Sequence, residues 1–136
     1  MASSPGKPLS QKLGLKPGFC ILVDGAPKDY RKLVGEWPEG ATLAAKPGGK
    51  LDVIHLFATE AKGLAVRLSR YREAIAPDGM IWVSWPKKTS GVATDLSDVV
   101  VRDTALSLGL VDIKVCAVDE VWSGLKFVIP KAQRAK

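Results

Sequence analysis

The sequence predicts one α/β domain with a Rossmann-like arrangement: a mostly parallel, twisted β-sheet, helices on both of its faces and a C-terminal antiparallel hairpin. Short apolar runs alternate with segments of helical periodicity, which is typical of crossover units on a parallel sheet. A chain of 136 residues has room for one hydrophobic core. We therefore expect a leader with a short helical turn over 1–17, a single domain over 18–130 and a basic tail over 131–136.

The first half of the chain supplies three predicted strands and one short helix. The unbroken apolar run Phe19–Val23 indicates a strand buried on both faces. A helix ending at Gly35 is expected next, with Pro27 at its first position, where a missing N–H is tolerated. The run 41–45 is a weak strand, and the apolar run 51–58 is a strong one.

The clearest helix follows the third strand. Leu64, Leu68, Tyr71 and Ile75 recur at steps of four, three and four, so they mark one helical face. A turn is expected at 77–79, because Pro-Asp-Gly is a strong turn signal. Met80–Ser84 is then predicted as the fourth strand.

The last part of the chain predicts a helix and a hairpin. Asp95 is expected to cap the N-terminus of the helix, and Gly109 to end it in the left-handed conformation. The runs Val111–Val118 and Leu125–Ile129 are predicted to pair as antiparallel strands. The carboxylates of the connecting segment 119–124 are expected to cap and solvate its turn.

Charge and hydropathy exclude several classes of protein. The net charge is +6, but the basic residues are scattered along the chain, so we expect no nucleic-acid partner. The apolar runs are far shorter than the roughly 20 residues of a membrane-spanning helix. The N-terminal residues also lack an apolar segment of signal-peptide length. We therefore expect a cytoplasmic protein without a membrane segment.

The two cysteines and the single histidine suggest no metal site. Cys20 and Cys116 are far apart within apolar runs and form no Cys-x-x-Cys pair, so both are interpreted as buried thiols. His55 stands inside an apolar strand without a recognisable nucleophile or metal ligand beside it, which favours a hydrogen-bonded core histidine.

The order of these elements resembles the later portion of class I S-adenosylmethionine-dependent methyltransferases. The segment Leu51–Phe57 is similar to the fourth strand of that family. The segment Ile75–Val83 is similar to its proline-glycine turn and fifth strand. The closing hairpin is the distinctive part, and the resemblance implies the Rossmann-like fold given above.

A longer resemblance covers the chain from about Leu9 to Ile129. It is to a bacterial group, the domain-of-unknown-function family numbered 3052. The runs that carry it are 11–18, 82–88 and 115–126. This resemblance implies the same fold and a bacterial cytosolic protein, and it implies no particular activity.

Three parts of the methyltransferase pattern are missing. The loop after the first strand, 24–29, holds one glycine where the family has a Gly-x-Gly-like loop that lets the cofactor approach the backbone. The segment 44–46 offers no carboxylate for ribose hydroxyls. The segment 57–60 replaces the Asx-Pro-Pro-aromatic motif. We therefore expect no cofactor, with S-adenosylmethionine as the disfavoured alternative.

Any ligand is expected beyond the carboxyl ends of the strands, where strand order reverses between the first and third strands. The residues that gather there, and thus the candidate ligand-binding residues, are Asp24, Gly25, Thr59, Ser84, Trp85, Lys87, Lys88, Thr89 and Ser90. The lysines and hydroxyls of the 87–94 loop precede a helix, an arrangement suited to an anion such as phosphate.

The sequence carries no recognisable catalytic motif, so three hypotheses remain open. The leading one is a Rossmann-like domain without methyltransferase activity that binds a small anionic ligand or a protein partner through the Asp24 turn and the 87–94 loop. A divergent S-adenosylmethionine-dependent methyltransferase is the second. A structural or interaction module, with an exposed sheet edge available for pairing, is the third.

Overall fold

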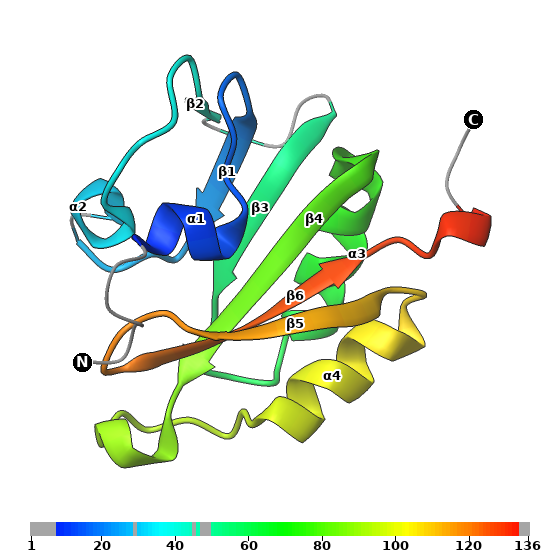
Figure 1. The fold of residues 1–136 in the computed structure, drawn as a ribbon. Coiled ribbons are helices and arrows are strands. Elements are labelled where there is room, and N and C mark those ends of the chain that lie inside the picture. Colours follow the sequence, from blue (N-terminus) through cyan, green and yellow to red (C-terminus); the bar gives the residue numbers. More distant parts are fainter. Residues whose placement is uncertain (1–7, 29, 45, 47–49, 134–136) are drawn as a thin grey trace.

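Six strands form one mixed sheet in the computed structural model, which describes residues 8–28, 30–44, 46 and 50–133 (Figure 1). The strands are β1 (Cys20–Asp24), β2 (Thr42–Ala44), β3 (Leu51–Phe57), β4 (Ile75–Pro86), β5 (Val111–Ala117) and β6 (Trp122–Val128). They lie in the order β2-β1-β3-β4-β6-β5. Neighbours from β2 to β4 are parallel, whereas β6 pairs antiparallel with both β4 and β5. The predicted α/β fold with a closing hairpin is confirmed.

Helices cover both faces of the sheet. The helices are α1 (Leu9–Leu13), α2 (Tyr30–Val34), α3 (Leu64–Ala74) and α4 (Asp98–Ser107), with short 3-10 turns η1 (Lys88–Ser90) and η2 (Lys131–Gln133). Buried residues of α1 and α2 join one apolar cluster, and buried residues of α3 and α4 join the other. The sheet therefore separates two cores, as a three-layer α/β sandwich requires.

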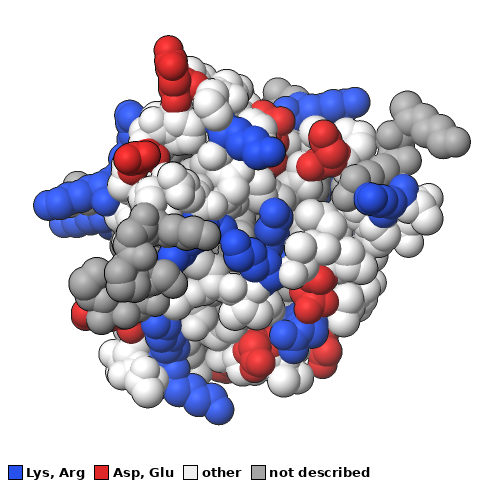
Figure 2. Space-filling view, in the orientation of Figure 1, with Lys and Arg blue, Asp and Glu red and all other residues white. Residues whose placement is uncertain are grey.

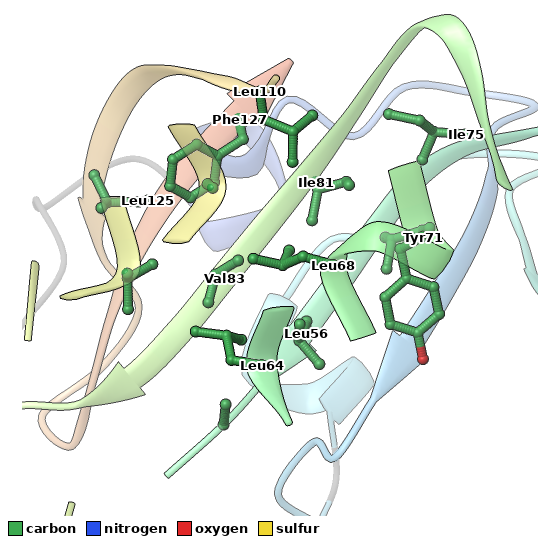
Figure 3. Packing of buried hydrophobic residues seen from close by; sticks show 14 of the residues in the cluster. Leu56, Leu64, Leu68, Tyr71, Ile75, Ile81, Val83, Leu110, Leu125 and Phe127 are labelled. Atoms are coloured by element: carbon green, nitrogen blue, oxygen red, sulfur yellow. The ribbon is translucent and has the colours of Figure 1, made fainter. Parts of the chain in front are cut away.

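Alternation along the central strands divides the side chains between these two cores. In β3, Ile54 and Leu56 belong to the cluster beneath α3 and α4, whereas Val53 and Phe57 belong to the cluster beneath α1 and α2. Figure 3 shows the first cluster, in which leucines of α3 point at aliphatic side chains of the sheet. Both faces of β3 are thus buried, which explains why its sequence is almost continuously apolar.

The leader contributes to the second core. Leu9, Leu13 and Leu15 are buried there, and the indole N–H of Trp82 donates to the carbonyl oxygen of Leu13 at 2.9 Å. This bond satisfies the polar atom of a fully buried tryptophan. Residues 1–7 of the predicted leader and 134–136 of the predicted tail lie outside the described residues. The division of the chain into leader, domain and tail stays a prediction.

Three predicted helix and turn boundaries are wrong. Helix α4 is capped by Ser97, whose hydroxyl accepts from the N–H of Val100, because Asp95 instead accepts a bond from another loop. Helix α2 begins at Tyr30, so Pro27 precedes it rather than starting it. The predicted turn at 77–79 lies within β4, where a shift of register against β3 absorbs the extra residues.

The two cysteines differ in exposure. Cys116 is buried, as predicted, whereas Cys20 is only partly buried because it begins a strand next to the short strand β2.

No helix in the described part of the chain is long and apolar enough to cross a membrane.

Candidate ligand-binding site at the carboxyl rim of the sheet

The strand order reverses at β1, which has β2 on one side and β3 on the other. In open α/β sheets, ligands bind beyond the carboxyl ends of the strands at such a reversal, which here means the ends of β1 and β3. Because β1, β3 and β4 are parallel, the loops that follow Asp24, Phe57 and Pro86 all leave the sheet at the same rim. The sequence places the candidate site between the first and third strands. In the structure, the strand order reverses at this same place.

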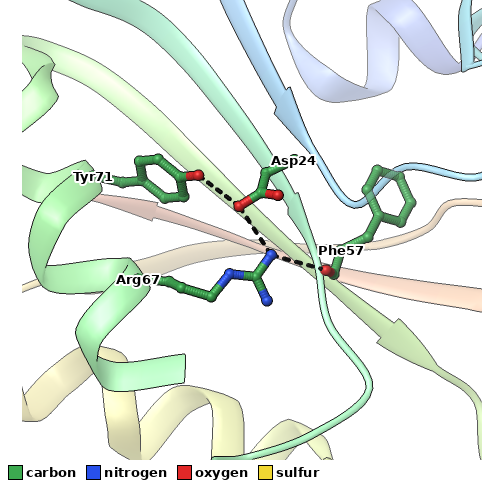
Figure 4. A network of polar contacts seen from close by, with 4 residues as sticks. All are labelled: Asp24, Phe57, Arg67 and Tyr71. Atoms are coloured by element: carbon green, nitrogen blue, oxygen red, sulfur yellow. Dashed lines mark hydrogen bonds and ion pairs between the residues drawn. The ribbon is translucent and has the colours of Figure 1, made fainter. Parts of the chain in front are cut away.

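Asp24, the last residue of β1, is held by two side chains of α3 (Figure 4). Its Oδ2 atom accepts a hydrogen bond from the Tyr71 hydroxyl at 2.5 Å and lies 2.9 Å from an Nη2 of Arg67. The same Arg67 nitrogen donates to the carbonyl oxygen of Phe57 at 3.3 Å. Within the described residues, no hydrogen bond or ion pair reaches Oδ1 of Asp24, which Figure 4 shows turned away from both partners.

This network fixes the ionisation of Asp24. Partial burial alone would raise the pKa of the carboxyl, but the hydrogen bonds from Tyr71 and Arg67 and the charge of Arg67 outweigh burial and lower it. Burial, together with the bond to Asp24, raises the pKa of Tyr71 to about 12. Asp24 is therefore a carboxylate at neutral pH, with one oxygen committed to the protein and one free to accept from a ligand.

Gly25 lets the chain turn directly after this carboxylate. Its φ of +73° lies in the left-handed region, and a Cβ atom there would lie 2.8 Å from the carbonyl oxygen of Phe57. A glycine is required here for two reasons: its φ is positive, and the backbone of β3 leaves no room for a side chain. It holds the β1 turn against the end of β3.

Gly25→Ala is expected to lower the free energy of unfolding by about 2 kcal/mol, because it adds a steric overlap to left-handed strain. Gly63→Ala is the matched control, since Gly63 has a φ of +82° but no atom within 4 Å of the added methyl group. The control should lose only about 1 kcal/mol. Urea denaturation of both variants measures the difference, and equal losses would contradict the proposed packing of Gly25 against β3.

The loops after β3 and before α4 are tied to each other. The Thr94 hydroxyl donates to the carbonyl oxygen of Thr59 at 2.6 Å, and the N–H of Ala61 donates to Oδ1 of Asp95 at 2.8 Å. The loop after β3 thus bridges the Asp24 turn and the segment that leads into α4. Asp95 was predicted as a helix cap, and here it fixes this loop instead.

A pocket of about 420 Å³ opens beyond the carboxyl end of β4. Its walls combine an aromatic and aliphatic surface with basic and hydroxyl groups and one carboxylate, and they are formed by Trp85, Lys87, Lys88, Thr89, Leu96, Ser97, Asp98, Val115 and Ser123. Four of the residues predicted from the sequence, Trp85, Lys87, Lys88 and Thr89, are thus brought together in this pocket. The mixture suits a ligand with an apolar body and an anionic group.

The remaining predicted residues are placed elsewhere. Ser84 is fully buried and bonds to His55, so its hydroxyl does not face a ligand. The hydroxyl of Ser90 donates to the carbonyl of Lys87 and stabilises η1. Thr59 contributes its carbonyl to the loop contact with Thr94. The structure therefore gives two groups at one rim, the Asp24 turn and the Trp85 pocket, with the loop after β3 between them.

His55 lies in a buried polar chain on the α2 face. Its Nδ1 is 2.7 Å from the Tyr30 hydroxyl and its Nε2 is 2.7 Å from the Ser84 hydroxyl. The ring also stacks on Phe57 with a centroid distance of 4.2 Å. Complete burial lowers the pKa of His55 to about 3, so the ring stays neutral, donating at one nitrogen and accepting at the other. The predicted hydrogen-bonded core histidine is confirmed.

Sequence reasoning missed Arg67 and Tyr71 as partners of Asp24. Tyr71 was assigned to the core face of its helix, and Arg67 stands four residues earlier on the same face. A basic residue and a tyrosine at this spacing, on the helix that follows β3, were the available signal. Asp119 behaves as predicted, because its Oδ1 accepts from the N–H groups of Val121 and Trp122 and caps the hairpin turn.

Among the described residues, no group of three or more His, Cys, Asp or Glu side chains is placed to hold a metal ion.

Solved structures of the same fold include several methyltransferases. An S-adenosylmethionine-dependent methyltransferase from Aquifex aeolicus is 14% identical, with a TM-score of 0.67 over 88% of this chain and 87% of that chain. Magnesium protoporphyrin IX methyltransferase from Synechocystis, with bound S-adenosylmethionine, is 12% identical, with a TM-score of 0.58 over 84% and 71%. The 1,6-didemethyltoxoflavin-N1-methyltransferase of Burkholderia thailandensis, with bound S-adenosylhomocysteine, is 13% identical, with a TM-score of 0.58 over 88% and 73%.

At these identities the likeness shows a methyltransferase-like fold. No family model and no curated protein matches the sequence. The resemblance to the family numbered 3052 therefore stays a prediction. The expectation that no cofactor binds is contradicted, because neighbours with this fold hold S-adenosylmethionine or S-adenosylhomocysteine. That expectation relied on loop motifs, whereas the likeness to the methyltransferases is one of overall fold.

Proposed function

We propose that this protein binds S-adenosylmethionine or S-adenosylhomocysteine at the Asp24 rim and acts as a divergent methyltransferase. One observation supports the proposal most directly. An ionised carboxylate with a free oxygen stands at the end of β1, beside the reversal of strand order, in a fold shared with methyltransferases that bind these ligands.

The residues of the rim fit part of such a ligand. Oδ1 of Asp24 can accept a hydrogen bond from an ammonium or hydroxyl group, and Arg67 and Tyr71 hold the carboxylate in place for it. The end of β2 supplies Ala44 rather than a carboxylate, so the ribose hydroxyls would need other acceptors. Asp24 is therefore assigned to anchor the ligand. The lack of a carboxylate at the end of β2 is what makes the proposed enzyme divergent.

When bound, the sulfonium of S-adenosylmethionine supplies an electrophilic methyl group. The pocket lined by Trp85 and Lys88 is assigned to the methyl acceptor, with its apolar body against Trp85 and an anionic group against the lysines. These residues would contribute to catalysis by positioning the methyl acceptor. His55 is excluded as a general base, because it is fully buried and both of its nitrogens are occupied.

Titration calorimetry with S-adenosylmethionine and S-adenosylhomocysteine tests the proposal. Asp24→Asn is expected to weaken binding roughly tenfold, because it removes the charge from the bond accepted by Oδ1. Asp78→Asn is the control, since Asp78 is exposed near the start of β4, toward the opposite rim, and should bind like the unaltered protein.

Two results would overturn the proposal. One is heat indistinguishable from dilution when the unaltered protein is titrated with either compound at millimolar concentration. The other is equal affinity in Asp24→Asn and Asp78→Asn, which would place the ligand away from the Asp24 rim. The melting temperature of each ligand-free variant, measured first, separates loss of binding from loss of folding.

A further inference from the structure

Two lysines face each other across the β5–β6 hairpin. Lys114 and Lys126 are direct partners in the antiparallel register. Directly opposed side chains have Cβ atoms about 5 Å apart, and like charges in such a pair are destabilising. Neither lysine forms a salt bridge with any described residue. The sheet therefore holds two ammonium groups close together without a carboxylate between them.

Helix α1 and the turn after it bring further positive charge to the same face. The ammonium of Lys114 donates to the carbonyl oxygen of Lys12 at 3.4 Å, which ties β5 to the C-terminal end of α1. The Nζ atom of Lys126 lies above Gly14, 3.9 Å from the position that a Cβ atom would take there. We call this group the α1 basic cluster; its members are Lys12, Lys16, Lys114 and Lys126.

Electrostatic effects within the α1 basic cluster agree with this placement. Partial burial lowers the pKa of Lys126, and the charges of Lys114 and Lys16 lower it further. Burial raises the pKa of Cys116, the next inward-facing residue of β5, while the charges of Lys12, Lys114 and Lys87 oppose that rise. Several ammonium groups thus act on one small region of the sheet.

Figure 2 shows basic side chains gathered near the middle of this face, with no acidic side chain between them. The face is the one covered by α1, whereas the Trp85 pocket lies among residues of the α4 side. The cluster shares no member with the residues that line the proposed acceptor pocket, although the charge of Lys87, one of those lining residues, also reaches Cys116. Its existence does not depend on the proposed methyltransferase function.

We propose that the α1 basic cluster is a binding site for a compact oxyanion of the phosphate class. An anion with several oxygens can accept from both hairpin lysines at once and remove the repulsion that their register imposes. The lysines converge over one cross-strand pair and one helix end, rather than following a line. This geometry fits a single phosphate group better than the extended backbone of a nucleic acid.

The test compares melting temperatures with inorganic phosphate and with sodium chloride at equal ionic strength. For the unaltered protein, phosphate well above its dissociation constant should raise the melting temperature by about 3 °C beyond the chloride value. Lys126→Met should raise the melting temperature by about 1 to 3 °C in phosphate-free buffer, because it removes the opposed charge. It should also abolish the gain that phosphate gives.

Lys62→Met is the matched control, because Lys62 is exposed in the turn before α3. It should keep the full gain from phosphate. A methyl phosphate arm distinguishes a phosphorylated ligand from free phosphate, since preference for the ester indicates the former. Equal effects of phosphate and chloride, or an undiminished phosphate gain in Lys126→Met, would overturn the site. So would tighter, Lys126-dependent binding of a single-stranded oligonucleotide, which would show an extended polyanion surface instead.

Discussion

His55→Leu is expected to lower the free energy of unfolding by about 3 to 4 kcal/mol. Leucine fills a similar volume, but it can neither donate nor accept, so the hydroxyls of Tyr30 and Ser84 lose their shared partner. Ser84 is fully buried and Tyr30 is only 8% exposed, so water cannot replace the imidazole freely. An unsatisfied buried hydroxyl costs about 1 to 3 kcal/mol. Urea denaturation monitored by tryptophan fluorescence measures the loss.

A triple variant separates lost hydrogen bonding from lost packing. Tyr30→Phe/His55→Leu/Ser84→Ala removes the whole polar chain, and replacing every partner by an apolar group leaves nothing unsatisfied. It should therefore unfold at a higher urea concentration than His55→Leu alone. If the triple variant is less stable than the single one, the cost of His55→Leu comes from packing against Phe57 and not from the hydrogen bonds.

The central strands were predictable because burial requires apolar residues in their sequence. β3 is covered on both faces, so all but two of its seven residues are apolar, and the two polar ones, Asp52 and His55, are hydrogen-bonded. The helix boundaries were harder to predict, because they depend on contacts distant in sequence. Asp95 and Ser97 are both acceptable caps by residue type, and only the N–H of Ala61, 34 residues earlier, decides which one caps α4.

The candidate site was predictable at the level of the rim but not of each side chain. Parallel strand order brings Asp24 and Trp85 to the same edge, and this follows from the pattern of elements alone. Successive side chains of a strand point to opposite faces of the sheet, so a shift of one residue changes the face. Ser84 and Trp85 are neighbours in sequence, yet one points to His55 beneath α2 and the other into the cluster beneath α4. Arg67 was missed because its role is visible only when α3 is packed over β1.

Acidification is expected to destabilise the protein, because its one histidine is buried in the neutral form. His55 has a pKa of about 3 in the folded protein, against an ordinary value of 6.5 for a free histidine. Below about pH 6.5 the unfolded chain therefore binds a proton that the folded chain does not, so stability falls as the pH falls. This linkage amounts to a loss of about 2 kcal/mol at pH 5 and about 3 kcal/mol at pH 4.

The effect can be assigned to one residue, because the chain contains a single histidine. Proton uptake on unfolding should rise from about half a proton at pH 6.5 to nearly one proton at pH 5, which calorimetry in buffers of different ionisation enthalpy measures directly. The lowered pKa of Asp24 acts in the same direction, but only below the ordinary carboxyl value of 3.8, which lies outside this interval. His55→Leu should remove the proton uptake and flatten the profile over the same range. Constant stability of the unaltered protein from about pH 7 to pH 5 would mean that His55 is solvated and able to ionise in the native state, contrary to its burial between Tyr30 and Ser84.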